Sequence, residues 1–201
     1  MKSTRAIKVI TSLSVGVVLL ASLSWIGLGQ VSGRIDRISV FAGLDNRPEK
    51  TSEALNYLLV GSDTREGLTK AELKALRVGS VATAAGKRSD TMLLVHISKA
   101  RDKAVLVSIP RDSFALIPAH LNKSGKTIPA AYSKINSAFN WGGAPLLIQT
   151  IEEMSELKID HYIEVNFAGF AKVVDSLGGI EVCTKKDIDD PKSHLVLPAG
   201  V

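Results

Sequence analysis

The hydrophobic positions of the chain form one long run near its start and several short runs after residue 54. Leu55–Gly61 is a short apolar run that ends in glycine, and Met92–Ile97 and Ala104–Ile109 are two more, joined by the polar connection Lys99–Asp102. The last two runs, with their short connection, predict an antiparallel β-hairpin. Met92–Ile97 is apolar on both faces, which is typical of a strand that helices cover on both sides. We interpret Leu55–Gly61 as a further buried strand that feeds a loop.

The spacing of apolar residues predicts helices between and after these strands. The predicted helices are Leu68–Arg77, a helical turn that starts at a Ser133 cap and breaks at Gly142-Gly143, Ala144–Leu157 with Pro145 in its first turn, and Ala168–Leu177. His161–Phe167 and Gly179–Thr184 are predicted as strands, and Ser113–Tyr132 as a loop. Strands that alternate with helices indicate an α/β fold. We predict a three-layer α/β/α architecture with a central mixed sheet.

The long apolar run near the start predicts a membrane anchor. Val9–Gly33 contains no charged residue, and Ile7–Leu28 is long enough to cross a bilayer as a helix. The basic residues Lys2, Arg5 and Lys8 precede it, which keeps the N-terminus in the cytoplasm. A cleaved signal peptide is the alternative, but the run is longer than the apolar region of about 7–15 residues that such peptides carry. We expect a single-pass protein of the cell membrane with an extracytoplasmic domain.

These patterns divide the chain into four segments. Residues 1–8 are a predicted cytoplasmic tail, 9–29 a transmembrane anchor, 30–54 a juxtamembrane linker with a short docking element, and 55–201 the extracytoplasmic domain. A chain of 201 residues with 45% hydrophobic content is expected to form one domain of ordinary size.

Composition excludes some classes of function. The net charge is +5, but three of the basic residues precede the anchor, and no basic run with interleaved aromatic residues follows. We therefore expect no nucleic-acid binding. Cys183 is the single cysteine, which excludes an internal disulfide and a CxxC metal site. We predict that Cys183 is a small buried residue on a strand and that His96 is a hydrogen-bonded side chain of the core.

Charged side chains of both signs stand at the ends of the predicted strands. If Leu55–Gly61 pairs antiparallel with Met92–Ile97, the end of the first strand, the start of the second and the end of the third lie at one edge of the sheet. That edge then carries Asp63, Asp90 and Arg111. Two carboxylates and substrate oxygens are a ligand set that suits Mg²⁺.

Further basic residues belong to the same predicted edge. Arg65 and Arg88, like Arg111, carry planar guanidinium groups that suit phosphate oxygens, and Lys134 adds a compact charge if its helix points there. Carboxylates, a divalent metal and several cations together are what phosphoryl transfer requires. Ion pairs at the surface are an alternative of equal weight on spacing alone.

Five strings in order resemble motifs of the LytR–CpsA–Psr family of bacterial envelope proteins. They are LLVGSDTR, RSDTMLLVHIS, VSIPRDS, KINSAF and IDHYIEVNFAGFAKVVDSLGG, and the similarity covers roughly Leu55–Val201. The resemblance implies a membrane-anchored phosphotransferase of cell-wall assembly. Such an enzyme moves a glycopolymer from a polyprenyl-pyrophosphate carrier onto peptidoglycan, with Mg²⁺ or Mn²⁺ as its cofactor.

The resemblance also assigns residues. Asp63 and Asp90 resemble the family's metal-associated aspartates, and either can serve as base or metal ligand. Arg65, Arg88 and Arg111 resemble its pyrophosphate-binding arginines, and Lys134 its lysine near the same phosphates. The predicted catalytic group is Asp63, Asp90 and Arg111. Complete family members continue past Leu197–Gly200 with two more phosphate-contacting arginines, so we expect that the family's C-terminal part is missing here.

Two other functions stay open. The same site could hold the lipid pyrophosphate without chemistry, as an envelope regulator, or hydrolyse it with water, as a lipid pyrophosphatase. A polyprenyl chain requires an apolar slot in each case. Five apolar residues after Ser133 either line that slot or form an ordinary core: Ile135, Phe139, Leu146, Leu147 and Ile151.

Overall fold

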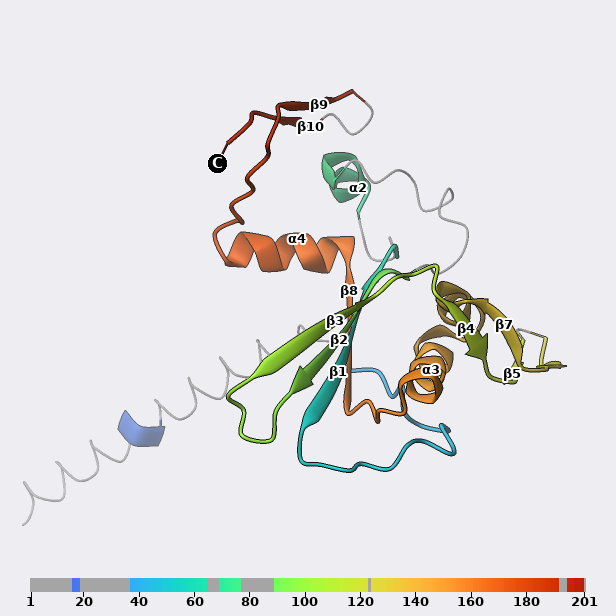
Figure 1. The fold of residues 1–201 in the computed structure, drawn as a ribbon. Helices are drawn as coiled ribbons and strands as arrows, with labels where there is room; N and C mark the ends of the chain where they lie inside the picture. Colours follow the sequence, from blue (N-terminus) through green and yellow to red (C-terminus); the bar gives the residue numbers. More distant parts are fainter. Residues whose placement is uncertain are drawn as a thin grey trace, which may run out of the picture. The chain divides into compact units, whose positions relative to one another are not determined.

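The computed structural model describes residues 16–18, 37–64, 69–76, 89–122, 124–191 and 195–200 of the chain (Figure 1). The chain divides into two compact units, Met1–Ser39 and Val40–Val201. Most of the predicted tail and anchor therefore lies outside the described residues. Within the described ranges, no helix is both long enough and apolar enough to cross a bilayer, and the anchor stays a prediction.

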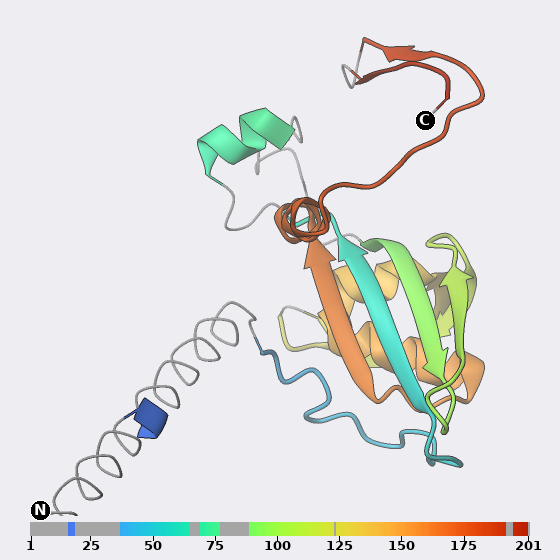
Figure 2. The same cartoon turned by 90° about the vertical axis from the view of Figure 1, so that its left-hand side faces the viewer.

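A four-stranded mixed sheet forms the centre of the second unit (Figures 1 and 2). Its order is β3-β2-β1-β8, where β1 is Leu55–Ser62, β2 is Ser89–Ile97, β3 is Ala104–Ile109 and β8 is His161–Asn166. β2 pairs antiparallel with both β1 and β3, whereas β8 pairs parallel with β1. The predicted hairpin and the antiparallel pairing of its first strand with β1 are confirmed, and so is a mixed α/β fold.

One face of this sheet packs on helix α3, Ile135–Ser155 (Figure 2). Burial alternates along β1, so that Leu58 and Val60 are buried while their neighbours are only partly covered. This alternation is expected of a strand with one covered face. The predicted break in the helix is confirmed, because Gly143 has φ +68° and ψ −156°.

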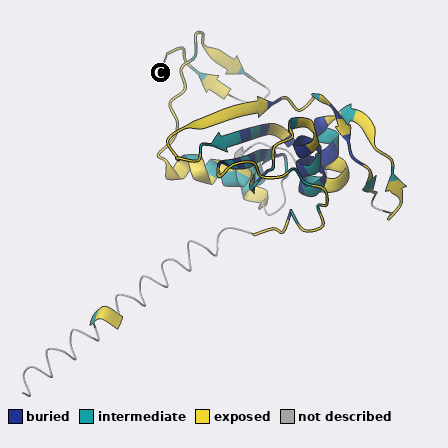
Figure 3. Cartoon of the chain, turned by 60° about the horizontal axis from the view of Figure 1, so that its bottom comes forward, coloured by how far each residue is buried: buried dark blue, intermediate teal, exposed yellow. Residues whose placement is uncertain are grey.

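The apolar residues after Ser133 form the core. Five of them are at most 5% exposed and pack against the buried residues of β1 and β2: Ile135, Phe139, Leu146, Leu147 and Ile151. Of the two interpretations of this apolar stripe, the ordinary core is therefore confirmed (Figure 3).

The prediction of a loop over Ser113–Tyr132 is wrong. β4 (Phe114–Ile117) pairs with β7 (Ala131–Lys134), and β5 (His120–Leu121) pairs with β6 (Thr127–Ile128). Ala115 and Ile117 are buried against α3, so tertiary packing holds strands too short to give a clear sequence pattern. The predicted Ser133 cap is also wrong, because Lys134 precedes the helix and makes no side-chain capping bond.

The segment that directly precedes β1 packs on the core. Val40 is buried in the core, and Phe41 and Leu44 pack against it. Arg47 binds the Glu152 carboxylate through Nη2 at 2.7 Å and Nε at 3.0 Å, and it also donates to the Ile159 carbonyl. These contacts fix the chain on the last turn of α3 before it enters the sheet.

Two predictions near the end of the chain are wrong. The predicted strand Gly179–Thr184 is irregular apart from a single bridge between Thr184 and Gly200. Gly178 and Gly179 have φ values of +82° and +97°, which are incompatible with extended backbone. Cys183 consequently lies exposed in an irregular segment rather than buried on a strand.

The remaining helices follow the predicted positions closely. α2, Lys70–Leu76, begins with a capping box in which Thr69 and Glu72 exchange hydrogen bonds. These bonds from Thr69 lower the pKa of Glu72. α4, Phe167–Ser176, begins at Asn166, whose side chain accepts from the Gly169 N–H at 2.8 Å. A short hairpin, β9 (Ile188–Asp190) and β10 (Leu195–Leu197), follows.

The sheet face that points away from α3 is only partly covered. It carries Leu59, Leu93 and Ile163, none of which is fully buried, and α4 contacts the adjoining strand β8. Among the described elements, no further helix makes extensive contacts with these strands on this face, and the third layer of the predicted sandwich stays a prediction. His96, at the far end of β2, binds Asn56 Oδ1 through Nδ1 at 2.7 Å, so the predicted hydrogen bond is confirmed, but the residue is only partly buried and not part of the buried core.

Candidate functional site

A β-bulge positions one of the two candidate aspartates. Along β1 and β2 the pairing passes from Gly61 opposite Thr91 to Ser62 opposite Ser89. Asp90 is therefore an extra residue without a partner in the ladder. Bulges turn a side chain away from its regular direction and are common beside functional sites. Asp63 follows directly after β1, so both candidate aspartates leave the sheet at the same end.

The hairpin brings Arg111 to Asp90. Met92 pairs with Ile109, so two residues further Arg111 stands opposite Asp90. Arg111 Nη1 donates to Asp90 Oδ1 at 2.5 Å. Both side chains are about half exposed, at 50% and 48%. The bond to Asp90 raises the pKa of Arg111, so the guanidinium keeps its charge. Its other N–H groups can still bind an anion.

Asp112 joins this pair to Lys134. Lys134 Nζ lies 2.9 Å from Asp112 Oδ1, and Arg111 Nε lies 3.8 Å from Asp112 Oδ2. The hydrogen bond from Lys134 lowers the pKa of Asp112. Asp112 is not among the site residues predicted from the sequence, although its position directly after Arg111 marks it. Asp90, Arg111, Asp112 and Lys134 thus form one row of alternating charges, which we call the charged row.

Backbone contacts hold this row at the start of α3. The Ile135 N–H donates to the Ser113 carbonyl at 2.8 Å, and the Asn136 N–H donates to the Arg111 carbonyl at 3.2 Å. The loop that carries Arg111 is therefore fixed to the first turn of the helix. The partial positive charge at a helix N-terminus adds to that of Lys134.

An apolar pocket of about 450 Å³ opens beside the two aspartates. Leu59, Gly61 and Leu93 line it from the sheet face that points away from α3. Phe170 and Val173 of α4 line it from the other side and are more than half exposed. Asp63 and Asp90 line its polar end. We call this cavity the apolar pocket.

The position of this pocket differs from the slot that the sequence suggested. The candidate slot lay among the helices after Ser133, which are buried in the core on the opposite face. The helix that lines the pocket, opposite the strands, is instead α4, whose Phe167, Phe170 and Val173 recur at helical spacing. That helical spacing is the signal in the sequence that could have located the pocket.

The structure places four of the six predicted site residues. Asp63 and Asp90 line one pocket, and Asp90 is linked through Arg111 and Asp112 to Lys134. Arg65 and Arg88 lie outside the described residues. Within the described ranges, no group of three or more His, Cys, Asp or Glu side chains could hold a metal ion. The roles of all six residues stay predictions.

Comparison with known proteins gives a consistent set of relatives. The sequence model of the LytR_cpsA_psr family matches residues 33–201. The chain is 38% identical over 145 residues to a Corynebacterium glutamicum protein named "Probable cell wall biosynthesis protein LcpB", which covers 72% of this chain and 32% of that protein. It is 32% identical over 154 residues to the polyisoprenyl-teichoic acid–peptidoglycan teichoic acid transferase TagT of Bacillus subtilis, covering 74% and 41%.

Solved structures agree with these matches. A structure described as the LytR-CPS2A-psr family protein YwtF (TagT) with bound octaprenyl pyrophosphate lipid is similar with a TM-score of 0.53 and 27% identity, covering 83% of this chain and 55% of that one. TagT bound to LIIa-WTA gives a TM-score of 0.54 at 27% identity and covers 83% and 52%. The chain spans 32% and 41% of the length of the two curated relatives named above.

Proposed function

The chain belongs to the LytR–CpsA–Psr family, and from this premise we propose that it moves a glycopolymer from a polyprenyl-pyrophosphate carrier to peptidoglycan in cell-wall assembly. Relatives named as teichoic acid transferases and a similar structure with bound octaprenyl pyrophosphate support the substrate class. We also propose that the protein works at the outer side of the cell membrane, held by the anchor predicted for residues 9–29.

One observation carries this proposal: the charged row begins at the polar end of the apolar pocket. A polyprenyl pyrophosphate has a long apolar tail and a strongly anionic head, and it requires both environments side by side. Asp90 belongs to both, since it lines the pocket and binds Arg111 at 2.5 Å. A pocket of this kind, apolar with a few convergent polar groups, is typical of ligand sites.

The cations of the row would bind the pyrophosphate. Arg111 keeps N–H groups that can contact two phosphate oxygens at once, and Lys134 supplies a point charge beside the start of α3. Because Arg111 is already held by Asp90 and Asp112, it is oriented before the lipid arrives. An oriented cation stabilises the charge of the transition state without reorganising first.

The two aspartates would act at the transferred phosphorus. Asp63 and Asp90 at one end of the pocket fit Mg²⁺, which takes one or two carboxylates together with phosphate oxygens. When bound, the ion would neutralise charge on the pyrophosphate. The hydroxyl of the acceptor attacks the phosphorus that carries the glycan, the bond from that phosphorus to the bridging oxygen breaks, and polyprenyl phosphate leaves. The proton of the hydroxyl passes to one of the two carboxylates.

A transfer assay on the full chain in detergent tests this function. The donor is an octaprenyl-pyrophosphate-linked sugar with a radioactive label in the sugar, supplied with Mg²⁺ and peptidoglycan. We expect the label on peptidoglycan, with release of octaprenyl phosphate, and loss of transfer in the Asp90→Asn and Arg111→Ala variants. Label released as free sugar phosphate would indicate a pyrophosphatase. Donor binding without any turnover would indicate a binding protein, and either result would contradict the proposed transfer.

A further inference from the structure

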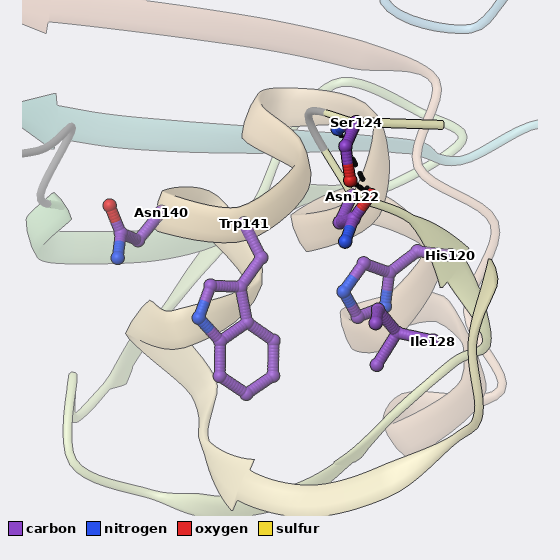
Figure 4. A pocket seen from close by; sticks show the side chains of 6 residues that line it. All are labelled: His120, Asn122, Ser124, Ile128, Asn140 and Trp141. Atoms are coloured by element: carbon purple, nitrogen blue, oxygen red, sulfur yellow. Dashed lines mark hydrogen bonds between the residues drawn. The ribbon is translucent and has the colours of Figure 1, made fainter. Parts of the chain in front are cut away.

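A second cavity, of about 570 Å³, lies between the β5–β6 hairpin and the part of α3 just before its break (Figure 4). Its described lining residues share one property, the absence of a carboxylate, ammonium or guanidinium group: His120, Asn122, Ser124, Ile128, Asn140 and Trp141. None of the residues of the charged row or the apolar pocket is among them. We call it the hairpin cavity.

Two aromatic rings form one wall of the hairpin cavity. The rings of His120 and Trp141 lie 5.6 Å apart between centroids with an angle of 14° between their planes, so they are stacked. Trp141 as a whole residue is 41% exposed even though its ring packs on that of His120. An exposed aromatic face beside polar groups offers a surface on which a ligand can pack.

The break in α3 fixes the position of Trp141. The helix departs from helical geometry at Gly143, with φ +68°, two residues after the tryptophan. A Cβ atom at Gly142 would lie 2.5 Å from the Cβ of Leu146, so this position requires glycine. The sequence Trp141-Gly142-Gly143 therefore sets where the helix bends and which side chain stands at the bend.

Some polar atoms of the hairpin cavity form hydrogen bonds with neighbouring residues, and others have no described hydrogen-bond partner. Asn122 Oδ1 accepts from the Ser124 N–H at 3.0 Å, the Ser124 hydroxyl at 2.8 Å and the Lys126 N–H at 2.9 Å. These bonds turn the amide nitrogen outward, to the side of His120 (Figure 4), and no described residue accepts from it. The His120 Nδ1–H donates to the Pro118 carbonyl at 2.9 Å, so Nε2 of the neutral ring is an acceptor.

We propose that the hairpin cavity binds a neutral pyranose sugar of a glycan. The C–H groups on one face of a pyranose carry a small positive charge and pack on the negative face of an aromatic ring such as Trp141. Its hydroxyls both donate and accept, and they match the amide nitrogen of Asn122 and Nε2 of His120. The described lining residues offer amide, hydroxyl and imidazole groups beside the indole, a combination that suits an uncharged polar ligand.

The position of the cavity connects it to the charged row. Trp141 follows Lys134 on the same helix, and seven residues of α-helix span about 10 Å along the axis. That is the length of about two sugar units. The inference rests on the proposed function, since a glycan transferase must hold sugars near the phosphorus it acts on. The sugar would belong either to the acceptor strand or to the glycan on the donor.

Calorimetric titration with chitotetraose, a soluble neutral glycan, tests the proposal on the full chain in detergent. The sequence has two tryptophans, so a Trp25→Phe background makes Trp141 fluorescence a report on this cavity alone. We expect that the sugar binds and changes this fluorescence. Trp141→Ala should weaken binding at least about fivefold, and Trp141→Phe, which keeps an aromatic face, should lose less. Tyr132→Ala, an exposed aromatic residue outside the cavity, is the matched control and should bind as before.

A second pair of titrations separates the two sources of the sugar. Octaprenyl pyrophosphate and its N-acetylglucosamine-bearing form are compared in the starting protein and in Trp141→Ala. If Trp141→Ala weakens binding of the sugar-bearing lipid alone, the donor glycan lies in the cavity. If Trp141→Ala binds both lipids as before but no longer binds chitotetraose, the acceptor lies there. Absence of chitotetraose binding together with equal lipid binding by both proteins would overturn the proposal and leave the proposed function standing. If the starting protein does not bind octaprenyl pyrophosphate at all, that result would count against the proposed function instead.

Discussion

Two arginine–carboxylate pairs stand at opposite ends of α3 and differ in their exposure. Arg47 and Glu152 meet at its last turn, where their side chains are 18% and 2% exposed. Arg111 and Asp90 meet beside its first turn, where the exposed fractions are 50% and 48%. Glu152 Oε1 also accepts from the Ile159 N–H at 2.7 Å, so the buried pair has partners on all sides. The exposed pair keeps N–H groups and carboxylate oxygens open to a ligand.

This difference separates stability from binding. Breaking a buried, fully hydrogen-bonded pair leaves an uncompensated charge in the interior, which is strongly destabilising. An exposed pair contributes little to stability because water screens both charges. We therefore interpret Arg47–Glu152 as the contact that holds the segment before β1 in place, and Arg111–Asp90 as a prepared part of the site.

Glu152→Ala should have the largest effect on stability. Removing the carboxylate takes away the hydrogen-bond acceptor of the Arg47 guanidinium and of the Ile159 N–H. We therefore expect the free energy of unfolding to fall by about 3–5 kcal/mol in urea titrations. Glu153→Ala, an exposed neighbour, should change it by no more than about 0.5 kcal/mol. Equal effects of the two substitutions would remove the contrast between the two ends of the helix.

Phe170→Lys should weaken lipid binding without unfolding the protein. Phe170 is 58% exposed and lines the apolar pocket, so a charge there removes apolar contact with a bound polyprenyl chain. We expect about tenfold lower affinity for octaprenyl pyrophosphate, in line with about 1.5–3 kcal/mol for a buried aromatic side chain. Val105→Lys on β3, 55% exposed and outside the pocket, is the control. If both variants bind alike, the pocket does not hold the lipid.

Asp160→Asn should change how stability depends on pH. Burial of the Asp160 carboxylate opposes its ionisation, but the bonds from Lys50 at 2.7 Å and the Asn56 N–H at 2.9 Å outweigh burial and lower its pKa. A lowered pKa gives stability that is present above about pH 4 and is lost as the pH falls through the folded pKa. We expect the variant to be about 1–2 kcal/mol less stable at pH 7 and to lose less on acidification, by urea titration from pH 7 to pH 3.

A carboxylate of the charged row offers a comparison for that result. The pKa of Asp112 is also lowered, by Lys134, but this carboxylate lies at the surface. Asp112→Asn should therefore flatten the acid dependence of stability less than Asp160→Asn does. The opposite order would show that Asp112 in the charged row contributes more to stability than an exposed carboxylate should.

Lys134→Met should have the smallest effect on stability. The Lys134–Asp112 pair is exposed on both sides, and water screens exposed pairs so strongly that they contribute little to stability. Affinity for octaprenyl pyrophosphate should fall severalfold, and the loss should shrink at high salt because screening already weakens this contact. A loss that is independent of salt would indicate a role in packing rather than charge.

The parts of the fold that follow from the sequence are those with a local cause. The hairpin of β2 and β3 follows from two apolar runs and a short polar link, and it alone places Arg111 opposite Asp90. The break at Gly143 follows from its glycines. The strands within Ser113–Tyr132 could not be predicted from the sequence, because the strand that contains Ala115 and Ile117 depends on the cover of α3.

The candidate site also has one part that follows from the sequence and one part that only tertiary packing decides. The strand ends bring Asp63, Asp90 and Arg111 to one end of the sheet, as the sequence predicts. The apolar pocket could not be assigned to the correct face, because an amphipathic helix such as α4 and a core helix such as α3 both offer apolar stripes. Only tertiary packing decides that Phe139 is buried while Phe170 stays 58% exposed.

The central claim is that the charged row and the apolar pocket form one site for a lipid with a pyrophosphate head. The most direct measurement compares the affinities of the full chain for octaprenyl pyrophosphate and for octaprenyl alcohol, in the starting protein, in Arg111→Ala, and in Arg101→Ala at the opposite end of the same hairpin. Because a charge-assisted bond to the pyrophosphate is lost, Arg111→Ala should weaken pyrophosphate binding roughly 10–100-fold and leave alcohol binding and the free energy of unfolding unchanged. Arg101→Ala should match the starting protein. An Arg111→Ala variant that keeps the full preference for the pyrophosphate would contradict the account.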